Sequence, residues 1–138
     1  MKILVVNAGS SSIKFTIYSM KNEQMLAKGQ VERIGLSEPK LLYKRNDGIG
    51  VEAKANVKTP TEALRLICEK LVDKEVGVLK SLKEVEAIGH RVVHGGEQIT
   101  KPVVIDTHVK DIIKDCFALA PLHNPPNYSG IEACEEIF

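Results

Sequence analysis

The chain has 138 residues, a formal net charge of +1, 43% hydrophobic residues and 27% charged residues. These values are ordinary for one globular domain, and the near-zero charge gives no electrostatic reason to expect a nucleic-acid or membrane partner. No stretch approaches the roughly 18 apolar residues of a membrane span, and the apolar run after Lys2 is too short for a signal peptide. The three cysteines lack a CxxC spacing, so we expect reduced thiols and a cytoplasmic protein.

The chain begins with two predicted strands joined by a serine-rich loop. Residues 1–6 form a nearly continuous apolar run with β-branched side chains, which is typical of a buried strand. Residues 13–18 alternate between apolar and polar side chains, as expected for a second strand. The loop is therefore predicted to be the tip of a hairpin.

This loop carries the groups that hold a phosphate. Gly9 and its neighbours expose backbone N–H groups, Ser10 and Ser12 add hydroxyl donors, and Lys14 supplies a positive charge. Asn7, at the end of the first strand, can offer a carbonyl oxygen to a hydrated Mg²⁺. The alternative is an ordinary turn, because Gly, Ser and Asn are common turn formers. The pattern is neither a Walker A loop nor a dinucleotide-binding fingerprint.

Further strands are predicted over residues 24–34, 41–43 and 49–51. The last two flank Asn46-Asp47-Gly48, which is a strong signal for a hairpin turn. Antiparallel strands followed by strands that alternate with helices predict an α/β fold, in which helices pack against a mixed sheet.

A helix is predicted to begin at Thr59. Thr59 is the expected cap, Pro60 takes the first helical position, and Glu62 completes a capping box. The apolar stripe of this helix consists of Ala63, Leu64, Ile67 and Leu71. Residues 73–86 are amphipathic and could be either helical or irregular.

A second candidate site follows in residues 87–97, where a predicted core strand, residues 87–93, runs into a double-glycine turn. Arg91 lies near the end of this strand, where its planar fork of donors suits a carboxylate or a phosphate. Val93, two residues on, is expected on the same face, so the pair could hold a short carboxylic acid. The alternative is a structural ion pair between Arg91 and an acidic residue.

The third candidate segment lies between two predicted helices, residues 107–117 and 125–138. Three prolines are expected to make the loop between the helices rigid and to present His123 from it. Asn124 is predicted to cap the second helix, with Pro125 at its first position. Because that helix ends in acidic and apolar residues without a closing glycine, we expect the chain to be truncated.

The strings NAGSSSIK, GHRVVHGGE and APLHNPPN, in this order, resemble the acetokinase family, which comprises acetate and propionate kinases. The acetate kinases are the nearest match and the butyrate kinases a looser one. The resemblance covers essentially the whole chain and implies the amino-terminal domain, residues 1–138, of a two-domain enzyme with an actin-like, ribonuclease-H-like fold. It also implies transfer of a phosphoryl group from ATP to acetate, giving ADP and acetyl phosphate, with Mg²⁺ as cofactor.

The resemblance assigns roles to several of these residues. Asn7 is expected to help hold Mg²⁺, and Arg91 to hold the acetate carboxylate or the transferring phosphoryl group. His123 is expected to donate a hydrogen bond near the reacting oxygens. The nucleotide phosphates would be contacted by Ser10, Ser12 and Lys14. The methyl group of acetate would be contacted by Val93 and Leu122.

Other functions remain open at this point. Propionate, butyrate or a sugar could replace acetate as the substrate, although a sugar kinase would not need Arg91 beside a small apolar pocket. The chain could also be a non-catalytic module that binds phosphate. The resemblance implies a homodimer for the complete enzyme, whereas the isolated 138 residues are expected to be inactive.

Overall fold

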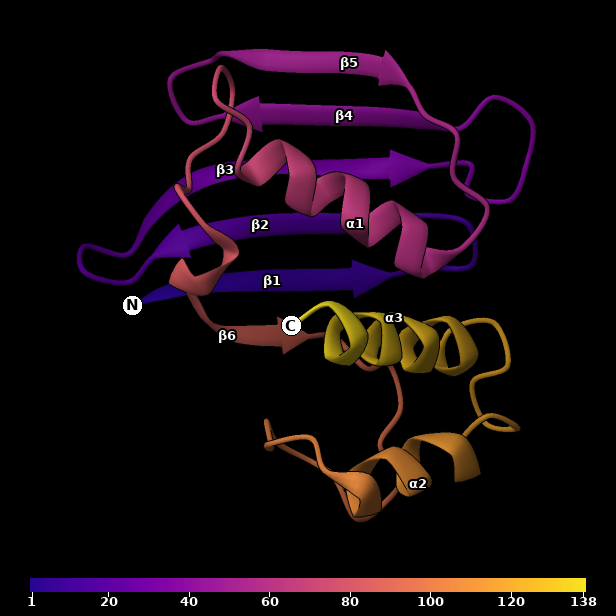
Figure 1. Ribbon diagram of the computed structural model, residues 1–138. Coiled ribbons are helices and arrows are strands. Elements are labelled where there is room, and N and C mark those ends of the chain that lie inside the picture. Colours follow the sequence, from indigo (N-terminus) through magenta and orange to yellow (C-terminus); the bar gives the residue numbers. More distant parts are fainter.

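The computed structural model describes all residues, 1–138, as one mixed sheet with helices on one face (Figure 1). The strands are β1 (Lys2–Ala8), β2 (Ile13–Ser19), β3 (Gln24–Glu32), β4 (Lys40–Arg45), β5 (Gly50–Lys54) and β6 (Val85–His90). The helices are α1 (Pro60–Leu71), the short 3₁₀ helix η1 (Leu82–Glu84), α2 (Thr107–Asp115) and α3 (Asn124–Ile137). No helix is both long and apolar enough to cross a membrane.

The strand order is β5-β4-β3-β2-β1-β6, in which only β6 runs parallel to its neighbour, β1. Helices α1 and α3 pack against each other and cover one face of the sheet, while α2 lies beyond the β6 edge (Figure 1). The core lies between that face and α1, and includes Leu4, Val6, Ile17, Leu64 and Ile67. This layered arrangement confirms the predicted α/β class.

The opposite face of the sheet is not covered by any helix of this chain. Along β1, Leu4, Val6 and Ala8 are buried, whereas Val5 is 40% exposed. The prediction that β1 is buried throughout is therefore wrong, because only alternate side chains reach the helix-covered face.

The turn and the helix cap predicted in the first half of the chain are both present. The β4–β5 hairpin turns at Gly48, whose φ of +89° lies in the left-handed region that favours glycine. Thr59 caps α1 by accepting a hydrogen bond from the Glu62 N–H at 3.2 Å. The Glu62 carboxylate, however, accepts from Lys58 N–H at 2.6 Å, so the predicted capping box is displaced by one residue.

Candidate functional site

The serine-rich turn between β1 and β2 keeps most of its donors free. Gly9 N–H donates to Ser12 O at 2.8 Å, and Ser11 O accepts from Ile34 N–H at 2.8 Å. These bonds fix the shape of the turn, while the N–H groups of Ser10, Ser11 and Ser12 have no backbone partner. Unpaired N–H groups beside hydroxyls are a favourable environment for an anion.

Two of the predicted charged or polar residues stand next to this turn. Asn7 and Lys14 are directly paired across β1 and β2, so both belong to the uncovered face. Arg91 follows the end of β6, and its N–H donates to Val6 O at 3.2 Å. The sheet therefore places Lys14, Asn7 and Arg91 side by side at one end of three adjacent strands.

Arg91 is exposed and belongs to none of the ion pairs in the structure. The alternative interpretation, a structural pair with an acidic residue, therefore has no support here. An unpaired guanidinium beside the serine-rich turn is available to an anionic ligand.

The predicted core strand over residues 87–93 is wrong in two respects. β6 ends at His90, so Arg91 and Val93 do not share a strand face, and Val93 is 41% exposed. β6 is also the edge strand of the sheet, and Ala87 is exposed. After Arg91 the chain no longer pairs with β1, because the Val93 N–H donates a hydrogen bond to Oδ1 of Asn127 at 3.0 Å.

The segment before α3 also differs from the prediction. Leu122 is 75% exposed and His123 is exposed, so both remain at the surface of this chain. His123, not Asn124, occupies the N-cap position, and its side chain makes no capping bond. Pro125 lies in the first turn of α3, as predicted, and Pro126 lies there too, so Pro121 alone of the three prolines belongs to the loop.

Asn124 is a buried connector, fully shielded from solvent. Its Oδ1 accepts from His94 N–H at 3.0 Å, and its Nδ2 donates to His94 O at 2.8 Å and to Ile113 O at 3.2 Å. This side chain therefore ties α3 to the segment after Arg91 and to α2. The sequence showed it only as a possible cap, because its partners are some 11 and 30 residues away along the chain.

Asn127, one turn further along α3, is the second buried amide, at 2% exposure. Its Oδ1 accepts from Val93 N–H at 3.0 Å, and its Nδ2 donates to Ala8 O at 2.9 Å. Sequence reasoning missed this residue. The only signal was a pair of asparagines three apart on one helix face.

His90, which ends β6, is held between the sheet and α3. Its Nδ1 lies 2.8 Å from Arg91 O, while its buried Nε2 has no hydrogen-bond partner. Burial lowers the pKa of His90 below its usual value, although the bond to Arg91 O opposes this shift. A Cβ at Gly130 would lie 2.4 Å from Nε2, so α3 can approach His90 only because glycine stands there.

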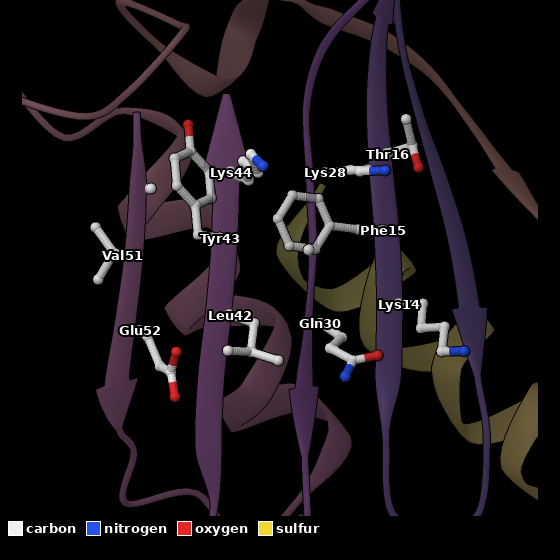
Figure 2. A pocket seen from close by; sticks show the side chains of 12 residues that line it. Lys14, Phe15, Thr16, Lys28, Gln30, Leu42, Tyr43, Lys44, Val51 and Glu52 are labelled. Atoms are coloured by element: carbon white, nitrogen blue, oxygen red, sulfur yellow. The ribbon is translucent and has the colours of Figure 1, made fainter. Parts of the chain in front are cut away.

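Two hollows adjoin these residues. The first, of about 600 Å³, lies on the uncovered face and is lined by Lys14, Thr16, Lys28 and Lys44, among others (Figure 2). The second, of about 1240 Å³, is a mainly apolar groove beside β6 whose lining includes Arg91, Val93 and Phe138.

Neither hollow gathers the serine-rich turn together with Arg91 and His123. The end of the sheet thus holds Lys14, Asn7 and Arg91, but neither of these two hollows is lined by all three.

Comparison with known proteins shows the family of this chain. A profile of the Acetokinase family matches residues 2–138. The chain belongs to this family. It is 51% identical to acetate kinase from Methanosarcina acetivorans and 50% identical to that from Caldanaerobacter subterraneus subsp. tengcongensis, over 138 residues in each case. Each alignment covers 100% of the chain and 34% of the relative, so the chain spans about a third of the length of these relatives.

Solved structures agree with this assignment. Acetate kinase from Porphyromonas gingivalis superimposes with a TM-score of 0.95 at 39% identity, and a propionate kinase from Francisella tularensis subsp. tularensis with 0.88 at 36%. Both comparisons cover 99% of this chain and 34% of the other. The acetokinase chain described here therefore has the actin-like fold of these kinases, as predicted.

Proposed function

We propose that the complete protein is an ATP-dependent carboxylate kinase that transfers the γ-phosphoryl group of ATP to acetate, giving ADP and acetyl phosphate. The observation that carries this proposal is the row of Lys14, Asn7 and Arg91 beside a turn with unpaired donors, in a chain of the acetokinase family. Phosphoryl transfer requires positioning and charge neutralisation more than covalent chemistry, and these groups supply both.

On the nucleotide side, the turn would hold phosphate oxygens. The backbone N–H groups and the hydroxyls of Ser10 and Ser12 donate hydrogen bonds, and Lys14 offsets the negative charge. On the carboxylate side, Arg91 would bind acetate or the transferring phosphoryl group through two parallel N–H donors. Because Arg91 is tied to β1 through Val6 O, the two anions would meet at the end of the same strand.

Asn7 is the residue of this chain that fits a role in holding Mg²⁺. It is half-buried at the end of β1, and its side chain is not engaged in hydrogen bonding to a neighbouring element. No group of three metal-ligating side chains exists in the chain. A single amide oxygen is compatible with Mg²⁺, which keeps several waters and takes phosphate oxygens as ligands, and which would neutralise phosphate charge.

Val93, Leu122 and His123 would complete the acceptor side, with the two apolar residues near the methyl group and His123 donating to a reacting oxygen. All three are exposed in this chain, so other parts of the protein would have to close over them. Propionate is the second candidate substrate, because the propionate kinase from Francisella shares this fold and because Val93 and Leu122 are 41% and 75% exposed in this chain. We also propose a homodimer, which light scattering of the complete protein would test.

Substitution of Arg91 in the complete protein tests the central assignment. Charge-assisted hydrogen bonds contribute about 1.5–3 kcal/mol each, so losing two of them in Arg91→Ala should lower kcat/KM for acetate by roughly 10²–10⁴-fold. Arg91→Lys keeps the charge but loses the fork and should recover only part of this. Acetyl phosphate is trapped as its hydroxamate, with propionate assayed in parallel.

The matched control is Arg65→Ala, which removes an exposed arginine of α1 that pairs with Glu136. Its activity should stay near wild type. A stable Arg91→Ala protein with full activity would show that this residue does not hold the substrate. Phosphate binding without any turnover by the wild-type protein would instead favour a non-catalytic module.

A further inference from the structure

One buried side chain joins the two halves of the candidate site. Asn127 donates from Nδ2 to Ala8 O at 2.9 Å and accepts at Oδ1 from Val93 N–H at 3.0 Å. Ala8 immediately precedes the serine-rich turn, and Val93 is two residues after Arg91. A single planar amide therefore spans the phosphate side and the carboxylate side.

The chemistry of this position requires an amide. Its two partners are a carbonyl and an N–H, so the side chain must donate on one edge and accept on the other. A carboxylate at 127 could accept from Val93 but could not donate to Ala8, and an apolar side chain could do neither. Both backbone groups would otherwise be left without these partners inside the protein, which is unfavourable.

Gly130 strengthens the same connection. It lies three residues after Asn127, on the same face of α3. A Cβ there would stand 2.5 Å from Ala8 Cβ, so the helix can lie this close to the end of β1 only with glycine at this position. The close approach brings the Asn127 amide within reach of Ala8 O.

We propose that Asn127 is a positioning residue, which sets the spacing between the serine-rich turn and Arg91. This inference rests on the function proposed above. Beyond the bond from Arg91 N–H to Val6 O, residues 91–93 have no strand partner, so the Asn127 bond, together with the Asn124 bonds to the adjacent His94, fixes where this segment lies. Of the two asparagines, Asn127 is the one that also bonds Ala8, next to the serine-rich turn. In-line transfer depends on the separation of the two anions, and a displacement of about 1 Å can cost on the order of 100-fold in rate.

The kinetic test uses Asn127→Asp and Asn127→Ser in the complete protein. Asp removes the donor and adds a negative charge, while Ser leaves a hydroxyl and room for a water. Because Asn127 touches neither substrate, we expect kcat to fall by roughly 10–100-fold in both variants, while KM for acetate and for ATP each change by less than about threefold in Asn127→Ser, which adds no charge. Wild-type kcat in the folded fraction of both variants would overturn the proposal.

The control is Asn46→Asp. Asn46 Nδ2 also donates to a backbone carbonyl, Met25 O, at 3.0 Å, but it is exposed and lies at the β4–β5 turn, on the far side of the sheet from β6. It undergoes the same chemical change and should leave kcat unaltered. If both Asn127 variants fail to fold while Asn46→Asp folds, the residue is structural and the positioning role is refuted.

A second measurement does not depend on activity. Amide hydrogen exchange in Asn127→Asp should become faster both at Gly9, which closes the turn, and over residues 91–93, with α1 unchanged. Faster exchange over residues 91–93 alone would mean that Asn127 does not connect the two halves, and would overturn the inference. A wild-type protein that forms no acyl phosphate would refute the proposed function, while the exchange data would still decide whether Asn127 couples the two segments.

Discussion

Asn124→Ala should be one of the most destabilising substitutions of a polar residue in this chain. The Asn124 side chain is fully buried and holds His94 N–H, His94 O and Ile113 O. Removing it affects these partners unequally. Ile113 O retains a second donor, Cys116 N–H at 3.2 Å, whereas His94 loses a bond at both its N–H and its carbonyl.

The size of the effect follows from these two groups. A buried polar group left without a partner costs about 1–3 kcal/mol, and His94 is half-buried, so water can reach it only in part. Two such groups give an expected loss of about 2–4 kcal/mol in the free energy of unfolding. In contrast, Asn46→Ala removes one exposed bond to Met25 O and should cost less than about 1 kcal/mol.

Urea unfolding of the two variants, followed by circular dichroism, measures this difference. A lower midpoint with an unchanged slope reports a change in stability and not in the compactness of the unfolded chain. If the two variants differ by less than about 1 kcal/mol, solvent replaces the Asn124 side chain without penalty, and the reasoning from buried partners is wrong for this site.

Three further outcomes are expected. Because burial lowers the pKa of His90, this side chain takes up a proton at a higher pH in the unfolded chain than in the folded chain, as the pH falls below about 6.5. Stability should therefore fall with pH there, and His90→Asn should flatten the dependence of the melting temperature on pH. Burial raises the pKa of Cys68 to about 12 and that of Cys134 to about 11, so both thiols should resist iodoacetamide until the protein unfolds, as mass spectrometry will show. Gly130→Ala should lower the urea midpoint despite the better helix propensity of alanine, since its Cβ has no room against β1; an increase would contradict the close packing of α3.

Local signals in the sequence were sufficient for much of the fold. The alternation of residues 13–18, the Asn46-Asp47-Gly48 turn and the cap at Thr59 depend on neighbours within a few residues, and each is present. The serine-rich turn was also placed correctly between its strands. Its donors are set by local backbone geometry, which the sequence directly encodes.

The errors occur where distant segments decide the local structure. Val92 and Val93 are β-branched and favour a strand, but the Asn127 side chain of α3 accepts the Val93 N–H, and the pairing ends. Asparagine is a common capping residue, yet Asn124 is buried by its hydrogen bonds to His94 and to Ile113 of α2. No short-range pattern distinguishes a capping asparagine from one that is buried by tertiary contacts.

The choice of neutral amides at these connections has an electrostatic consequence for the candidate site. Acidic side chains elsewhere in the chain are used in ion pairs, such as Lys2 with Glu84 and Lys110 with Glu135. At the site itself the connectors are asparagines, and neither Arg91 nor Lys14 belongs to an ion pair. A carboxylate at position 127 would keep the bond to Val93 but would place a negative charge near the proposed anion sites, opposing phosphate and acetate alike. Amides thus fix the geometry of the site without weakening its attraction for two anions.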